Sequence, residues 1–173
     1  MSYPKAIDDA RRVDFLSSLA LIDTAPDENL DRIVRLCRNV FSVPMSTISL
    51  VTGDRQWFKA VVGLPVCETD REVAFCNHTI LGDEIFEVCD ARIDPVFMGN
   101  PLVTGEPFLR YYAGAPLIYD GVRLGALCLL DTEPRAPLSE EQRTVLVDLA
   151  DIVVREFHTQ RILRQSLVRL AGA

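Results

Sequence analysis

The feature that most limits the possible folds is a pair of apolar segments, 111–119 and 122–130, joined by Asp120-Gly121. An Asp-Gly pair between two such runs is a strong signal for a β-hairpin. On strict alternation, one face of the second segment carries Val122, Leu124, Ala126, Cys128 and Leu130, and the other carries Gly125, Leu127 and Leu129. Because both faces are apolar at mid-strand, other parts of the chain must cover each side of the sheet. An antiparallel sheet placed between helices meets this requirement.

A second hairpin is expected earlier in the chain. Residues 45–52 are rich in β-branched side chains, Gly53-Asp54 is typical of a turn, and 56–62 is the expected partner strand. Residues 63–110 are less regular and contain four prolines. They are expected to hold only a short helix near 76–81 and a short strand near 86–89.

Helices are expected on both sides of these strands. Leu16, Leu19 and Ala20 indicate a short first helix. A second begins within 24–28, where a proline and two acidic residues suit a first helical turn, and apolar residues follow at helical spacing. Residues 139–142, Ser-Glu-Glu-Gln, have the spacing of a capping box and open a long last helix.

Composition excludes several classes of function. The 173 residues carry a net charge of -7, which argues against binding to nucleic acids and to anionic membranes. No apolar run reaches the roughly 18 residues needed to span a bilayer, and the N-terminus has no secretory signal. The five cysteines include no Cys-x-x-Cys pair and are read as reduced thiols. A cytoplasmic protein is expected.

Several local strings carry a family resemblance. They are Ala20-Leu21-Ile22-Asp23-Thr24-Ala25-Pro26, Asp54-Arg55-Gln56-Trp57-Phe58-Lys59-Ala60, Phe75-Cys76-Asn77-His78-Thr79-Ile80-Leu81, Asn100-Pro101-Leu102-Val103, Tyr111-Tyr112-Ala113-Gly114-Ala115-Pro116-Leu117 and Gly125-Ala126-Leu127-Cys128-Leu129-Leu130-Asp131. Together they resemble the GAF domain, in particular the bacterial group found ahead of histidine kinase and diguanylate cyclase domains.

The resemblance implies a fold of α+β type. A six-stranded antiparallel sheet would be sandwiched between terminal helices on one face and the irregular insert, which closes a pocket, on the other. We expect a tail at 1–9, the GAF-like domain at 10–160 and a C-terminal helix extension at 161–173. The chain shows no output domain within this length, so it either acts in trans or is a piece of a longer protein.

The resemblance does not identify a cofactor. Members of the family bind cyclic nucleotides, bilins, haem or small metabolites, and others bind nothing. The chain lacks the Asn-Lys-x-Phe-Asp-Glu string that marks the cyclic-nucleotide group. An unidentified small molecule is therefore expected, at a site formed by Trp57, Phe75, Cys76, His78, Phe108 and Tyr112. Aromatic walls suit such a site, but plain core packing is an equal alternative.

Catalytic and metal-binding readings are weaker. Cys76 and His78 stand two apart on the expected short helix and so point to different faces, which disfavours a nucleophile–base pair. The two histidines are far apart in sequence, and no zinc-ligand spacing occurs. We therefore expect no catalytic residue, no metal site and no enzymatic turnover. One alternative is a thiol enzyme like the free methionine-R-sulfoxide reductases, because Cys67, Cys76 and Cys89 lie in the insert.

The leading expectation is a regulatory sensor in bacterial signal transduction, in which a bound ligand biases a helical dimer interface. A dimerisation or scaffold module with no ligand is the second alternative. Leu163, Leu167 and Leu170 follow one another at spacings of 4 and 3, like a coiled-coil seam. The homodimer is therefore expected to form through the terminal helices, with help from Leu16 and Leu19. A histidine kinase or diguanylate cyclase module is the partner that the resemblance implies.

Overall fold

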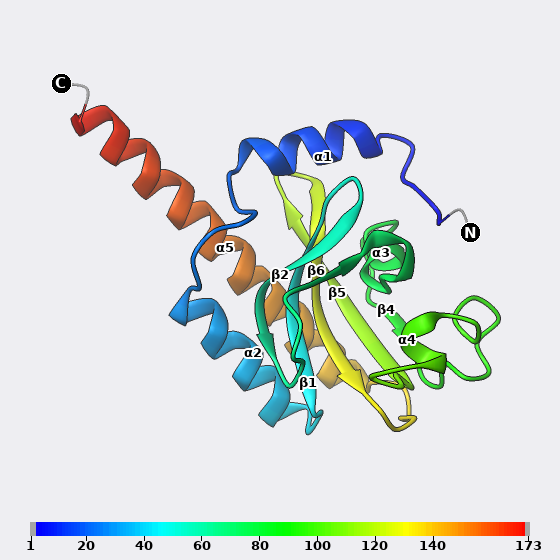
Figure 1. Ribbon diagram of the computed structural model, residues 1–173. Coiled ribbons are helices and arrows are strands. Elements are labelled where there is room, and N and C mark those ends of the chain that lie inside the picture. The colour runs from blue at the N-terminus through cyan, green and yellow to red at the C-terminus, as the bar shows by residue number, and fades with distance from the viewer. Residues whose placement is uncertain (1–2, 172–173) are drawn as a thin grey trace.

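The computed structural model describes residues 3–171 and holds one six-stranded antiparallel sheet in the order β3-β2-β1-β6-β5-β4 (Figure 1). Its strands are β1 (Met45–Val51), β2 (Arg55–Val62), β3 (Glu68–Asp70), β4 (Phe86–Val88), β5 (Tyr111–Tyr119) and β6 (Val122–Asp131). Both expected hairpins are present, and β1 pairs with β6 to join them. The expected fold class is confirmed.

Helices cover the two faces unequally. Three longer helices lie on one side and across one end of the sheet: α1 (Asp9–Ser18), α2 (Glu28–Val40) and α5 (Glu140–Ala171) (Figure 1). The other side carries the insert, with only η1 (Arg71–Val73), α3 (Cys76–Thr79) and α4 (Pro101–Thr104). The sheet is therefore a partition between two separate apolar cores.

Side-chain caps begin α2 and α5. Asp27 accepts hydrogen bonds from the backbone N–H groups of Asn29 and Leu30, so α2 begins just after the expected proline. Ser139 and Gln142 exchange both bonds of the expected capping box, at 3.0 and 3.2 Å. These local signals place α2 and α5 against the sheet at the right points in the chain.

The strict alternation expected for 122–130 is wrong, because it breaks at Leu124. Leu124 packs with Leu127 and Leu129 in the core under the terminal helices, whereas Ala126 and Cys128 face the insert. The cause is a β-bulge: Leu117 pairs with Gly125 and the next residue pairs with Arg123, which leaves Leu124 unpaired. The bulge turns every later side chain of β6 to the opposite face.

The last helix leaves the domain (Figure 1). Arg164 donates hydrogen bonds to the carbonyls of Leu19 and Ala20, at 3.0 and 2.6 Å, so α5 contacts the rest of the domain four residues beyond the expected boundary. Leu163, Leu167 and Leu170 are exposed. No helix within residues 3–171 is long and apolar enough to cross a membrane.

The structure corrects the expected role of Leu16 and Leu19 in the dimer, and it describes only part of the two terminal segments. Leu16 and Leu19 are buried in the core of their own domain, packed with residues of α2 and α5, so they are not available to a second copy. Of the expected tail and helix extension, residues 1–2 and 172–173 lie outside the described part of the chain.

Candidate functional site

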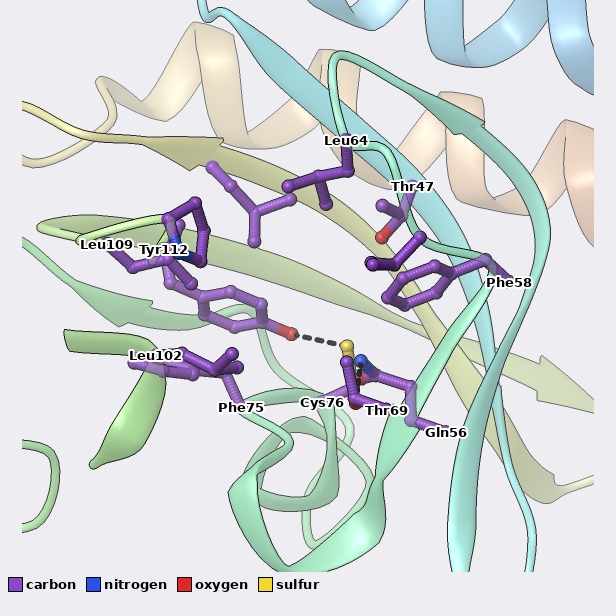
Figure 2. A pocket seen from close by; sticks show the side chains of 13 residues that line it. Thr47, Gln56, Phe58, Leu64, Thr69, Phe75, Cys76, Leu102, Leu109 and Tyr112 are labelled. Atoms are coloured by element: carbon purple, nitrogen blue, oxygen red, sulfur yellow. Dashed lines mark hydrogen bonds between the residues drawn. The ribbon is translucent and has the colours of Figure 1, made fainter. Parts of the chain in front are cut away.

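A small cavity of about 50 Å³ lies between the sheet and the insert (Figure 2). Its walls are mainly apolar, and its polar side chains come from the strands and from α3. The lining residues are Thr47, Gln56, Phe58, Leu64, Val66, Thr69, Phe75, Cys76, Leu102, Pro107, Leu109, Tyr112 and Leu130. The sheet supplies the floor, and the insert supplies the outer wall.

Three of the six expected site residues line this cavity: Phe75, Cys76 and Tyr112. Phe75 and Tyr112 lie against each other, with ring centroids 5.3 Å apart. The Tyr112 hydroxyl donates a hydrogen bond to Cys76 Sγ at 3.3 Å (Figure 2). The structure therefore brings together one residue of β5 and two residues at the start of α3.

Trp57 does not line the cavity. It packs with the apolar core under the terminal helices, and its neighbour Phe58 faces the cavity instead. Successive residues of a strand point to opposite faces, so only one of the two could enter the site. A bulge at Lys59 then keeps Ala60 on the same side as Trp57.

His78 and Phe108 also lie outside the cavity lining. The His78 ring is half-buried between Phe86 and Phe97, with centroids 5.7 and 4.8 Å away. Burial lowers the pKa of His78, and the charge of Asp94 offsets part of that effect. Phe108 is exposed on the loop that follows α4. Neither side chain is placed to contact a molecule in the cavity.

Gln56 is the site residue that sequence reasoning missed. Its side chain is 95% buried, since only 5% of the residue is exposed. Nε2 donates to the Thr69 hydroxyl at 3.1 Å, while Oε1 has no hydrogen-bond partner in the described structure. Strand alternation could have identified it, because Gln56 stands two residues before Phe58 and therefore shares its face of β2.

A buried chain of hydroxyls and thiols extends from Cys76 and Tyr112 of the cavity lining into the sheet. Cys76 Sγ lies 3.0 Å from Cys128 Sγ, and the Tyr112 hydroxyl lies within 3.5 Å of both sulfurs. Thr79 Oγ1 is 2.7 Å from the same hydroxyl, and Ser49 Oγ is 3.7 Å from Cys128 Sγ. All five side chains are buried. The cluster links α3 to three neighbouring strands.

The two thiols differ in acidity. Burial raises the pKa of the Cys76 thiol. Burial also acts to raise the pKa of Cys128, but hydrogen bonds from Cys76 and Tyr112 outweigh it and lower that pKa. Cys76 therefore keeps its proton more firmly than Cys128. Within residues 3–171 no hydrogen bond joins Cys76 to His78, which agrees with their expected separation on the helix.

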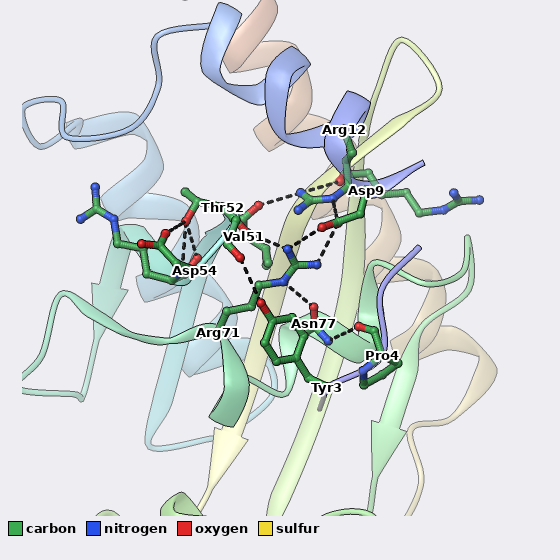
Figure 3. Close-up of polar contacts among 12 residues, drawn as sticks. Tyr3, Pro4, Asp9, Arg12, Val51, Thr52, Asp54, Arg71 and Asn77 are labelled. Carbon is green, nitrogen blue, oxygen red and sulfur yellow. Dashed lines mark hydrogen bonds and ion pairs between the residues drawn. The ribbon is translucent and has the colours of Figure 1, made fainter. Parts of the chain in front are cut away.

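A polar cluster ties the insert to the N-terminal helix (Figure 3). Arg71, which is fully buried, forms two parallel bonds with the Asp9 carboxylate at 2.7 and 2.8 Å. It also donates to the Asn77 side chain and to the Thr52 carbonyl. Arg12 donates to the same carboxylate at 2.9 Å. We call these residues the Arg71 cluster.

No group of three or more His, Cys, Asp or Glu side chains that could hold a metal ion occurs within residues 3–171.

Comparison with known proteins decides the family. A profile described as the GAF domain matches residues 25–157. The chain belongs to the GAF domain family. It is 41% identical over 160 residues to the cyclic di-GMP phosphodiesterase PA2567 of Pseudomonas aeruginosa. That match covers 92% of this chain but 27% of the relative, so the chain spans little more than a quarter of that protein's length.

Solved structures share the fold at low sequence identity. The GAF domain of a phosphoenolpyruvate-protein phosphotransferase from Coxiella burnetii is 16% identical, with a TM-score of 0.67 over 91% of this chain and 99% of that one. Free methionine-R-sulfoxide reductase from Neisseria meningitidis, in complex with its substrate, is 18% identical, with a TM-score of 0.65 over 94% and 98%. These likenesses concern the fold alone.

Proposed function

We propose that this GAF domain is a sensory module of a cyclic di-GMP signalling protein, in which a small ligand in the cavity controls the terminal helices. The observation that carries the proposal is the unpartnered amide oxygen of Gln56 at a mainly apolar cavity. A buried acceptor without a donor costs about 1–3 kcal/mol. A ligand that donates a hydrogen bond to this oxygen recovers that free energy.

Within residues 3–171, one end of the Gln56 side-chain amide lacks a hydrogen-bond partner in either orientation of that amide. Amide oxygen and nitrogen are assigned from the hydrogen-bond network. The Thr69 hydroxyl contacts one end of the Gln56 amide, and the other end has no partner in the described structure. The ligand is therefore a mostly apolar molecule with one polar group for Gln56.

The size of the cavity limits the ligand in this conformation. Sites for larger ligands measure about 300–1,000 Å³. At about 50 Å³ the cavity accepts only a few heavy atoms. Leu64, Val66, Leu102 and Pro107, which form part of its wall, belong to loops or short helices of the insert. A larger ligand would enter by displacing this wall rather than the sheet.

The Arg71 cluster supplies a route from the cavity to the terminal helices. Cys76 lines the cavity, and the next residue, Asn77, accepts a hydrogen bond from Arg71 at 2.8 Å. Arg71 in turn holds Asp9 on the first turn of α1. A shift of α3 on ligand binding would therefore move a group that contacts α1 directly.

The ligand is tested by native mass spectrometry of the purified domain and by saturation-transfer NMR with phenol and indole, which are aromatic donors larger than the present cavity and would enter by displacing its insert wall. The expected result is an added mass that denaturation removes, or saturation transfer to one of the probes. Gln56→Leu should remove the signal. Gln165→Leu, an exposed change on α5, should leave it intact. Purified protein that carries no added mass and binds neither probe would refute the ligand-binding proposal.

The dimer is a separate part of the proposal. Leu167 and Leu170 lie beyond the last contact that Arg164 makes with the domain, and both are exposed. Burying one such side chain contributes about 1.5–3 kcal/mol, so pairing with a second copy is favourable. Light scattering on the intact chain, and on a version ending at Phe157, should give a dimer and a monomer respectively. A monomeric intact chain overturns the dimer.

We also infer that the domain has no turnover of its own. Cys67 is exposed, Cys76 is buried and Cys89 is partly buried, and no contact joins any two of them within residues 3–171. Burial raises the pKa of Cys76 and of Cys89, so neither sulfur carries a standing thiolate, and neither has a second thiol of the insert beside it to resolve an intermediate. A methionine sulfoxide reduction assay should show no turnover above buffer. Turnover that is lost in Cys76→Ser or in Cys67→Ser would favour the reductase alternative.

A further inference from the structure

Two buried sulfurs, one lining the cavity and one behind it, lie closer together than an ordinary packing contact. Cys76 and Cys128 are 52 residues apart in sequence, yet their Sγ atoms lie 3.0 Å apart. Cys76 belongs to the insert and Cys128 to the middle of β6. The contact therefore crosses the boundary between the part of the domain that closes the cavity and the sheet beneath it.

Cavity access distinguishes this pair from the other buried thiol. Cys76 lines the cavity and Cys128 lies directly behind it. Cys37, equally buried, lies on α2 in the opposite core and does not line this cavity. A cavity of about 50 Å³ admits molecules of the size of water or hydrogen peroxide, since each water in the liquid occupies about 30 Å³.

We propose that Cys76 and Cys128 form a peroxide-reactive dithiol that closes to a reversible disulfide under the cavity. A disulfide has an S–S length of about 2.05 Å, so the sulfurs must approach by about 1 Å from their present separation. The bond would join α3 to β6 covalently. This inference goes beyond ligand sensing and does not depend on it.

The chemistry balances within the pair. With one proton of the pair lost to solvent, Cys128 carries the negative charge and takes the Cys76 proton across the S···S contact as the Cys76 sulfur reacts. The Cys76 sulfur attacks a peroxide oxygen, the O–O bond breaks, and a sulfenic acid and hydroxide form. The hydroxide takes the Cys128 proton and becomes water. Cys128 then attacks the Cys76 sulfur, the S–O bond breaks, and the second hydroxide takes a proton from solvent.

The overall reaction oxidises two thiols and reduces one peroxide to two waters. Tyr112 is placed to assist it, because its hydroxyl lies 3.3 Å from Cys76 Sγ and 3.5 Å from Cys128 Sγ. A thiol-based reductant returns the pair to its starting state by exchange.

The test uses the full chain carrying Cys67→Ser and Cys89→Ser, which removes the two thiols that are not buried. This protein is exposed to hydrogen peroxide, unfolded with an alkylating agent present, and digested without reduction. We expect one cross-linked species that joins the peptides of Cys76 and Cys128, about 2 Da lighter than their sum. Dithiothreitol should abolish it. Cys37 should remain alkylated throughout, because burial without cavity access should protect it.

A further Cys128→Ala change tests the order of events. The expected product is a sulfenic acid on Cys76, with no cross-link, that a dimedone-type reagent traps when the protein is unfolded in its presence. Circular dichroism establishes that this variant is folded. If Cys76 and Cys128 stay alkylated after peroxide treatment, or if Cys37 is oxidised as fast as they are, the dithiol proposal is wrong. The parent protein alone decides this point, so the outcome does not depend on the folding of the variant.

Discussion

The Arg71 cluster makes a prediction about stability that can be worked through in detail. Replacing Asp9 by Asn removes one charge and keeps the shape of the side chain. In the native protein the Asp9 carboxylate receives two bonds from the fully buried Arg71 and one from Arg12, whose side chain is 3% exposed. The substitution leaves both guanidinium groups without their negative partner. Removing one member of a buried ion pair costs about 3–5 kcal/mol, so a loss near 3 kcal/mol is expected.

Acid titration gives an independent view of the same carboxylate. Burial would raise the pKa of Asp9, but the hydrogen bonds and charges of Arg71 and Arg12 outweigh it and lower the pKa from 3.8 to about 2. A lowered native pKa stabilises the fold above the unfolded value, and that stability is lost as the pH falls from about 4 to 2. After allowance for solvent screening, the contribution is about 1–2 kcal/mol.

Urea unfolding followed by circular dichroism at pH 7 measures the first effect, and the same curves between pH 4.5 and 2 measure the second. Asp9→Asn should lower the unfolding free energy at pH 7 and flatten its fall in acid. Asp14→Asn, an exposed change on the same helix, is the matched control and should do neither. If Asp9→Asn stays within about 1 kcal/mol of the parent, the cluster does not have the energetic role derived above.

Three further predictions concern the sheet, the cavity floor and α5. Gly125→Ala would place Cβ 1.8 Å from the Ser49 carbonyl oxygen, so we expect a loss of about 3 kcal/mol or more in urea unfolding; near-parent stability would contradict the close approach. Tyr112→Phe leaves the buried Thr79 hydroxyl without its partner and should cost about 1–3 kcal/mol, measured by thermal unfolding; an unchanged melting temperature would argue against this bond. Leu167→Ser should turn the proposed dimer into a monomer in light scattering without changing the circular dichroism of the domain, and a variant that remains dimeric would move the interface elsewhere.

The sequence could predict the hairpins because their signals are local. Asp120-Gly121 lies directly between the strands that it joins, and Gly121 has the positive φ of 80° that such a turn requires. The capping box at 139–142 is equally local. β3 could not be found in this way, because its three residues, Glu68–Asp70, are polar and form a strand only by pairing with β2. Pairing partners distant in sequence carry no local signal.

The site residues could be predicted only where the side chains of a strand alternate between its two faces without a β-bulge. Phe75, Cys76 and Tyr112 were found, but Trp57 was chosen where Phe58 faces the cavity. The choice between two neighbouring aromatic residues needs the absolute face of β2, and periodicity gives only their relation to each other. In β6 the bulge at Leu124 reverses the faces, and it arises from the pairing with β5.

The most consequential residues of the insert lie next to each other on α3, in a helix of four residues. Cys76 reaches the cavity and the sulfur of Cys128, while Asn77 accepts a hydrogen bond from Arg71 and donates one to the Pro4 carbonyl. Adjacent helical residues point in different directions, so this one turn can contact the cavity and the N-terminal segment at once. A ligand that moves α3, or a disulfide that fixes it to β6, would therefore act on the same connection to α1. The two proposals converge on a single structural element, and Asp9→Asn should weaken the response to either input.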